Sequence, residues 1–170
     1  DGDMFVGTDS SLATVTINAE TFTNSDNGAY NFVNYGAFKL ASTDTVSFDD
    51  VQNLGAGAMV VSAAHGIDMA QVKNSSILNL DSGDAVINMA SLDIAGGTIN
   101  LKGTGLNIGS ALVTSGMLYQ NYAGALSDYD VNIDADNYVV SAKNVSVAGI
   151  DQASGAMRIN SSDVDVLGDI

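Results

Sequence analysis

The sequence contains neither cysteine nor proline. Without cysteine the chain has no disulfide, no thiolate metal site and no cysteine nucleophile, although this absence does not fix the cellular compartment. Proline makes up about 5 % of average sequences, and a fold that commits nearly every backbone N–H to a strand ladder would penalise it throughout. The absence of proline therefore favours continuous strand pairing.

Basic residues and glutamate are also scarce. Five Lys and Arg face twenty acidic residues, which gives a net charge of −15, and Glu20 is the only glutamate. A polyanion of this kind is repelled by nucleic acid and by anionic lipid, so we expect neither as a partner. Aspartate prefers turns and caps, whereas glutamate is a good helix former. Together with 18 Gly, this skew predicts a turn-rich chain with very little helix.

Long hydrophobic runs are missing as well. No uninterrupted apolar stretch approaches the about 20 residues of a membrane-spanning helix, so we expect no membrane insertion. The start, Asp1-Gly2-Asp3, has neither an initiator Met nor a basic-then-apolar leader, and we expect residue 1 to be a mature terminus or a fragment boundary. With 170 residues, of which 46 % are hydrophobic, the chain suffices for one domain with a buried core.

A three-residue phrase, in which two apolar residues flank one Asn or Asp, recurs between Val86 and Gly109. Its copies there are Ile87-Asn88-Met89, Leu92-Asp93-Ile94, Ile99-Asn100-Leu101 and Leu106-Asn107-Ile108. In a strand the two apolar residues point into a core and the polar one points away. The Gly- and Ser-containing joints bend the chain by roughly a third of a turn rather than reversing it as hairpins do. Three short strands and three corners, or roughly 18–22 residues, then make one coil of a parallel β-solenoid.

Further copies of the phrase flank this run at uneven intervals. They are Ile67-Asp68-Met69, Leu78-Asn79-Leu80, Val131-Asn132-Ile133, Val145-Ser146-Val147 and Val164-Asp165-Val166. Because no fixed period emerges, the predicted fold is an all-β, irregular, right-handed parallel β-solenoid (β-helix). The alternative is an antiparallel β-sandwich of pilin type, built from short strands.

We expect a single β domain over residues 1–170, in four parts. Residues 1–50 hold all five Phe residues and form an aromatic-rich N-terminal cap or the first coils, because an open end coil exposes core and unpaired strand edges. Residues 51–115 form regular coils, and residues 130–170 form the C-terminal coils. Residues 116–129 are predicted to form a projecting Tyr-rich loop, since Tyr119 and Tyr122 fall at helix-like spacing.

The Tyr-rich segment supplies the candidate binding residues Tyr119, Tyr122 and Tyr129. Loops that project from a rigid scaffold often carry binding sites, and Tyr is a common contact residue. The expected ligand is a glycan or a protein of a host or matrix. The alternative is that these rings pack back onto the solenoid wall.

Few residues offer other chemistry. His65 is the only histidine, no nucleophile motif accompanies it, and we expect no enzyme activity. Calcium is the more credible cofactor, because Asn132, Asp134 and Asp136 place three oxygen side chains at every second residue. An EF-hand would continue with Gly and Glu where the chain has Asn137 and Lys143. The alternative for these acids is a solvated acidic face.

The short Gly-, Ser-, Asn- and Asp-rich strands resemble the β-helical passengers of bacterial autotransporters and filamentous-haemagglutinin-like adhesins. Residues 76–116 carry the resemblance, through Leu78-Asn79-Leu80, Ile99-Asn100-Leu101 and Leu106-Asn107-Ile108. The resemblance implies an extracellular or cell-surface location and an adhesive or structural role. It transfers no functional residue, and the chain is far shorter and less regular than such passengers.

Repetition makes each coil a template for the next, so one subunit can stack on another and propagate into a filament. We therefore expect a subunit of a self-assembling, fimbria- or pilus-like filament of identical copies, with Val15, Ile17, Val164, Val166 and Leu167 as assembly residues. One alternative is an adhesin-type binding module that uses the Tyr-rich segment. The other is a pilin that donates the Leu12–Ile17 strand to a neighbour.

Overall fold

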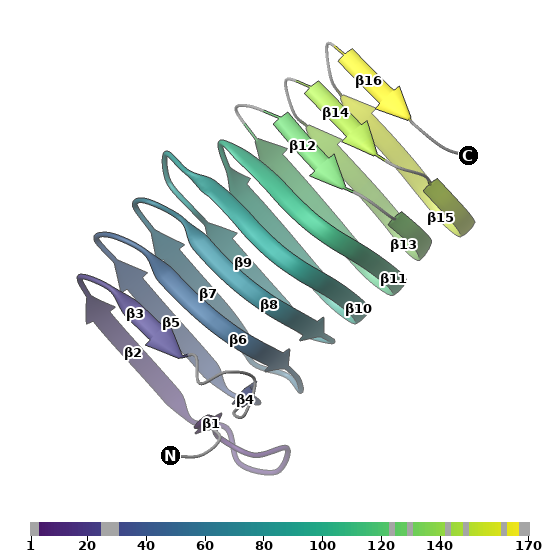
Figure 1. Ribbon diagram of the computed structural model, residues 1–170. Helices are drawn as coiled ribbons and strands as arrows, with labels where there is room; N and C mark the ends of the chain where they lie inside the picture. Colours follow the sequence, from purple (N-terminus) through teal and green to yellow (C-terminus); the bar gives the residue numbers. More distant parts are fainter. Residues whose placement is uncertain are drawn as a thin grey trace.

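The computed structural model describes residues 4–24, 31–122, 125–128, 131–141, 144–147, 150–160 and 163–166, with side chains for most of residues 4–107 and for residues 157–159. All of its strands belong to one sheet system, and every paired strand runs parallel to its neighbour. The one antiparallel contact in this part of the chain is an isolated bridge between Thr8 and Ser11. An antiparallel sandwich is therefore excluded for these residues, and the predicted all-β parallel solenoid is confirmed (Figure 1).

The strands follow one another without a helix in the described residues. The first half comprises β1 (Met4–Val6), β2 (Thr14–Ala19), β3 (Phe22–Asn24), β4 (Asn31–Asn34), β5 (Ala37–Ser42), β6 (Val46–Asn53), β7 (Ala58–Ala63), β8 (Ile67–Asn74) and β9 (Ile77–Asp81). The second half comprises β10 (Val86–Gly103), β11 (Gly105–Tyr122), β12 (Ala125–Asp128), β13 (Val131–Ser141), β14 (Asn144–Val147), β15 (Ile150–Asn160) and β16 (Asp163–Val166). No described segment forms a helix with the length and hydrophobicity needed to cross a bilayer.

Equivalent strand segments of successive coils stack into three faces. The first face begins with β3, continues through the leading halves of β6, β8, β10 and β11, and ends with β12, β14 and β16. The second face begins with β1 and β4 and ends in the leading part of β15. The third face begins with β2, β5, β7 and β9 and ends in the trailing part of β15. This matches the expected three strands and three corners per coil.

The coils differ slightly in length. Residues that bond across neighbouring coils are 19, 20 or 21 positions apart, as in Asn107–Asn88, Asn88–Asp68 and Asn100–Asn79. Residues 25–30 lie between β3 and β4, which together match the single strand β6. The solenoid is therefore irregular, as the uneven spacing of the phrase predicts.

Apolar columns fill the interior. Phe38, Met59, Leu78 and Ile99 stand above one another on the third face and are each at most 1 % exposed. Phe32, Phe38 and Phe48 enlarge the core at the N-terminal end, where the Phe32 ring lies 4.7 Å from that of Phe38. These three side chains thus form core of the early coils, whereas Phe5 is exposed.

The projecting loop predicted for residues 116–129 is wrong where the structure describes this segment. Residues 116–122 belong to β11, and residues 125–128 form β12. Met117 pairs with Thr98 of the preceding coil, so Gly116 takes the place that Gly97 has before Thr98. Tyr119 and Tyr122, which stand three residues apart, are therefore part of strand β11 and not of a helical turn.

Candidate functional site

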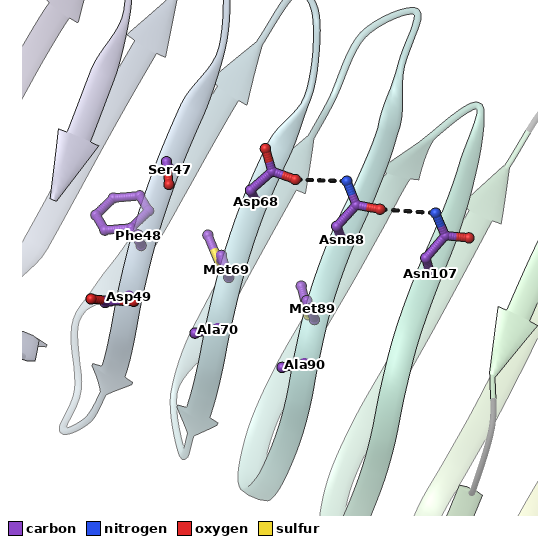
Figure 2. Close-up of a pocket in the computed structure, with 10 residues that line it drawn as sticks. All are labelled: Ser47, Phe48, Asp49, Asp68, Met69, Ala70, Asn88, Met89, Ala90 and Asn107. Atoms are coloured by element: carbon purple, nitrogen blue, oxygen red, sulfur yellow. Dashed lines mark hydrogen bonds between the residues drawn. The ribbon is translucent and has the colours of Figure 1, made fainter. Parts of the chain in front are cut away.

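The first face carries an external ladder of polar side chains. Asp68, Asn88 and Asn107 occupy equivalent positions on β8, β10 and β11. The Asn88 amide donates to Asp68 Oδ1 at 2.6 Å, and the Asn107 amide donates to Asn88 Oδ1 at 2.8 Å (Figure 2). Each amide can donate to one neighbour and accept from the other, so the ladder ties coils together along the solenoid axis.

An open hollow of about 460 Å³ runs beside this ladder. Its lining includes Asp49, Ala70 and Ala90 as well as the ladder residues (Figure 2). Ala70 and Ala90 are too small to fill the space between adjacent rows of side chains. The hollow is lined by more apolar than polar surface, with amide and carboxylate groups along the ladder.

The third face has a second external ladder with one ion pair. The Asn100 amide donates to Asn79 Oδ1 at 2.6 Å, and Lys102 Nζ lies 2.7 Å from Asp81 Oδ2. The hydrogen bond from Lys102 is the largest influence on the Asp81 carboxyl and lowers its pKa, against the opposing effect of partial burial. Both groups are well exposed, so this pair adds little to stability.

His65 has an acidic neighbour that the sequence does not place beside it. Its Nδ1 lies 3.0 Å from Asp84 Oδ1 at the corresponding turn of the next coil. Both side chains are more than half exposed, at 58 % and 75 %. A solvated pair of this kind is an ordinary surface contact, and it supports no catalytic assignment.

A third ladder is buried. Asn34, Asn53 and Asn74 end the second-face segments of three successive coils, and each is 0 % exposed. The Asn34 amide donates to Asn53 Oδ1 at 2.8 Å, and the Asn53 amide donates to Asn74 Oδ1 at 2.7 Å. Asn34 Oδ1 accepts from Gly36 N, and the Asn74 amide donates to Ser76 O. The ladder thus closes at both ends on backbone groups.

The two ends of the described solenoid present strand edges. At one end β1, β2 and β3 each pair with one neighbour, and at the other end β15 and β16 do the same, within the ranges that the structure describes. At the N-terminal end Met4, Val15, Ile17 and Phe22 are only partly buried against the core. Met157 and Ile159 of β15 are also partly buried. These ends combine unpaired backbone groups with apolar side chains, which promotes strand addition.

The backbone of β2 divides its hydrogen bonds between two sides. Ala37 N donates to Ala13 O at 2.8 Å, which fixes the phase of the β2–β5 ladder. Successive residues of a parallel strand direct their N–H and C=O groups to opposite sides, so Val15 and Ile17 bond toward β5. Thr14, Thr16 and Asn18 direct theirs to the free edge.

The predicted assembly residues lie at both ends. Val15 and Ile17 belong to β2, which pairs with β5 of its own chain, so this strand forms part of the solenoid. Val164 and Val166 belong to β16 and pair with Val145 and Val147. Leu167 lies outside the described residues.

The structure describes the backbone of two of the three predicted binding tyrosines. Tyr119 pairs with Asn100, and Tyr122 pairs with Gly103, both along β11. Tyr129 lies outside the described residues. Tyr119 and Tyr122 therefore lie along one strand rather than on a projecting loop.

The predicted calcium residues lie in β13. Asn132 pairs with Asp151, and Asp134 pairs with Ser154 beyond a register shift. Asp136 precedes Asn137, which pairs with Met117, so it occupies the corner that Gly116 occupies one coil earlier. Their side chains lie outside the described set, and no cluster of three metal-ligating side chains occurs within that set.

The sequence alone reveals neither the buried Asn ladder nor which residues of β2 direct their backbone groups to the free edge. The signal for the ladder is present, because Asn34, Asn53 and Asn74 each end an alternating segment and stand 19 and 21 residues apart. Gly36, Gly55 and Ser75 follow closely, which makes these asparagines look like turn residues.

Comparison with known protein families, curated proteins and solved structures finds no match to this chain.

Proposed function

We propose that this protein is a structural subunit of an extracellular filament, built by end-to-end stacking of identical β-solenoids. The observation that carries the proposal is the pair of strand edges at opposite ends of the described solenoid, each beside partly buried apolar side chains. A further coil placed on either end would pair the free backbone groups and cover these side chains.

Geometry favours stacking in one direction. Because all strands are parallel, β15 and β16 at one end can pair with β1, β2 and β3 of another copy as the coils pair within the chain. The two contacting surfaces differ, so the contact is heterologous and leaves a free end after every addition. Such a contact propagates into a rod.

The ladders suit a load-bearing role. The buried Asn34–Asn53–Asn74 row and the external Asp68–Asn88–Asn107 row both run from coil to coil. Their hydrogen bonds add to the backbone bonds that hold successive coils together. A pull along the axis is therefore resisted by side-chain as well as main-chain bonds.

The direct test removes one edge donor. In Thr16→Pro the free-edge N–H of β2 is lost, whereas the bonds of Val15 and Ile17 to β5 remain. Proline is tolerated on an edge strand whose N–H faces solvent, so the single copy should still fold. In the filament, the carbonyl that this N–H would bond is left without a donor, which costs about 1–3 kcal/mol. We expect the critical concentration for assembly, measured by light scattering and negative-stain microscopy, to rise about tenfold or more.

Asp9→Pro is the matched control, since it places proline in the exposed turn between Thr8 and Ser11 of the same coil. It should assemble like the unmodified protein, and circular dichroism should show both variants folded. Unmodified protein that stays monomeric at every concentration would contradict the proposal, as would unimpaired assembly of Thr16→Pro.

A further inference from the structure

The two ends of the described solenoid are interrupted at the same corner. The chain visits the faces in the order first, second, third, as β8 and β9 show for one coil. The first described strand, β1, lies on the second face, and the last, β16, lies on the first face. The open edges at the two ends thus cover the same three faces, with β1, β2 and β3 at one end and β15 and β16 at the other, so a second copy can meet each open edge with the equivalent face.

The following inference rests on the proposed filament and specifies how two copies contact each other within it. We infer that a second copy of this chain docks in a single register, with β1 and β2 against β15 and with β3 against β16. A coil rises along the solenoid axis between its first and its last strand. Rotating the copy by one face about that axis would therefore bring the two open coils out of line and leave strand edges unpaired. Sliding it by one residue would turn the partly buried Val15 and Ile17 outward.

The pairing within the chain gives the register. One column of paired residues on the third face runs through Thr16, Lys39, Val60, Asn79, Asn100, Tyr119, Val139 and Arg158. Continuing the column by one coil places Thr16 of the next copy beside Arg158. Val15 then follows Met157, and Ile17 follows Ile159, so partly buried apolar residues cover one another.

The phase of β2 agrees with this register. Thr16 directs its N–H and C=O to the free edge, as Ala37 directs its own toward β2. With Thr16 beside Arg158, its N–H faces the carbonyl of Met157, and its carbonyl faces the N–H of Ile159. The new contact therefore repeats the hydrogen-bond pattern inside the solenoid.

Disulfide trapping tests the register, because the chain has no cysteine of its own. Thr16 and Arg158 are both exposed and lie at opposite ends, so the double variant Thr16→Cys, Arg158→Cys can cross-link only between copies. Adjacent strands are about 4.8 Å apart, within the roughly 4.4–6.8 Å between Cα atoms that a disulfide requires. We expect a ladder of multimers on a non-reducing gel after mild oxidation.

Asn18→Cys with Arg158→Cys is the off-register control, since Asn18 is an exposed residue of the same strand. Its Cα would lie about 8 Å from that of residue 158, too far for a disulfide. We expect at least tenfold slower cross-linking than in the first pair.

The outcomes separate this inference from the proposed function. Microscopy could show filaments while the Asn18→Cys pair cross-links faster than the Thr16→Cys pair, or while neither pair cross-links. Either result would overturn the register but leave the proposed filament unaffected. The single variant Thr16→Cys could also form disulfide-linked dimers as fast as the double variant cross-links. This would indicate that two N-terminal ends contact each other, and it would overturn the register as well. A protein that forms no filament would overturn both.

Discussion

At the scale of single residues, asparagine has two different tasks in this solenoid. Asn100 and Asn88 point outward, where water can replace a lost partner. Asn53 is 0 % exposed, and its amide bonds to Asn74 Oδ1 and to Ile77 O while its own oxygen accepts from Asn34. A buried polar group that loses its hydrogen-bond partner costs its full desolvation free energy. The same asparagine side chain therefore contributes much more to stability in the buried ladder than on the surface.

Asn53→Leu should therefore be strongly destabilising. Leucine has a similar volume, but it leaves the Asn34 amide and the Asn74 oxygen without the partners they have now. Each unmet group costs about 1–3 kcal/mol, so we expect the free energy of unfolding from urea titration to fall by about 2–5 kcal/mol.

Asn100→Leu is the comparison, because it removes an equivalent 2.6 Å amide bond at the surface. Its cost should stay below about 1 kcal/mol. An equal decrease in the free energy of unfolding for the two variants would show that burial does not determine how much these ladders contribute to stability.

At the scale of strands, the sequence correctly predicts which residues of each repeated phrase point inward, but it misreads residues 116–122, which form part of β11, as a projecting loop. The copies centred on Asp68, Asn88 and Asn107 stack on one face, and those centred on Asn79 and Asn100 stack on another. Alternation predicts which side chains of each copy point inward, whereas the register between coils decides which copies stack on one another.

Other elements could not be predicted in the same way. In residues 116–122 the polar phrase is replaced by Met117, Leu118 and Tyr119, so only the register with β10 reveals a strand. The buried Asn ladder departs from alternating hydrophobicity, since a polar residue there points inward. Both cases depend on contacts between coils, which a single segment does not contain.

Corners depend on close backbone approach, and Gly97 is the clearest case. Its φ is +75°, and a Cβ at this position would lie 1.9 Å from Ser76 O. Gly97→Ala therefore combines a left-handed conformation, about 1–2 kcal/mol, with a clash of about 1–3 kcal/mol. We expect its melting temperature to fall well below that of the unmodified protein.

Gly66→Ala separates the two contributions. Gly66 has φ +129°, but a Cβ there would meet its nearest atom, Val86 O, at 3.6 Å. This variant should show the conformational cost alone and melt at a higher temperature than Gly97→Ala. The reverse order would mean that the coil spacing at the Gly97 corner relaxes easily.

At the scale of the whole molecule, charge and stacking oppose each other. Each copy carries a net charge of −15, so copies repel one another along the sides and at the ends. The proposed end contact consists of backbone bonds and apolar side chains, neither of which needs an ion pair. Repulsion should thus limit assembly at low salt and keep finished rods apart laterally.

We therefore expect sodium chloride to promote end-to-end assembly. The screening length falls from about 30 Å at 0.01 M to about 10 Å at 0.1 M, and the critical concentration measured by light scattering should fall several-fold over that range. Calcium chloride at matched ionic strength is the control, and a much larger effect of calcium would favour the predicted Asn132, Asp134 and Asp136 site. A critical concentration that rises with sodium chloride would instead mean that opposite charges hold the ends together, which would contradict a contact made by strand edges and apolar residues.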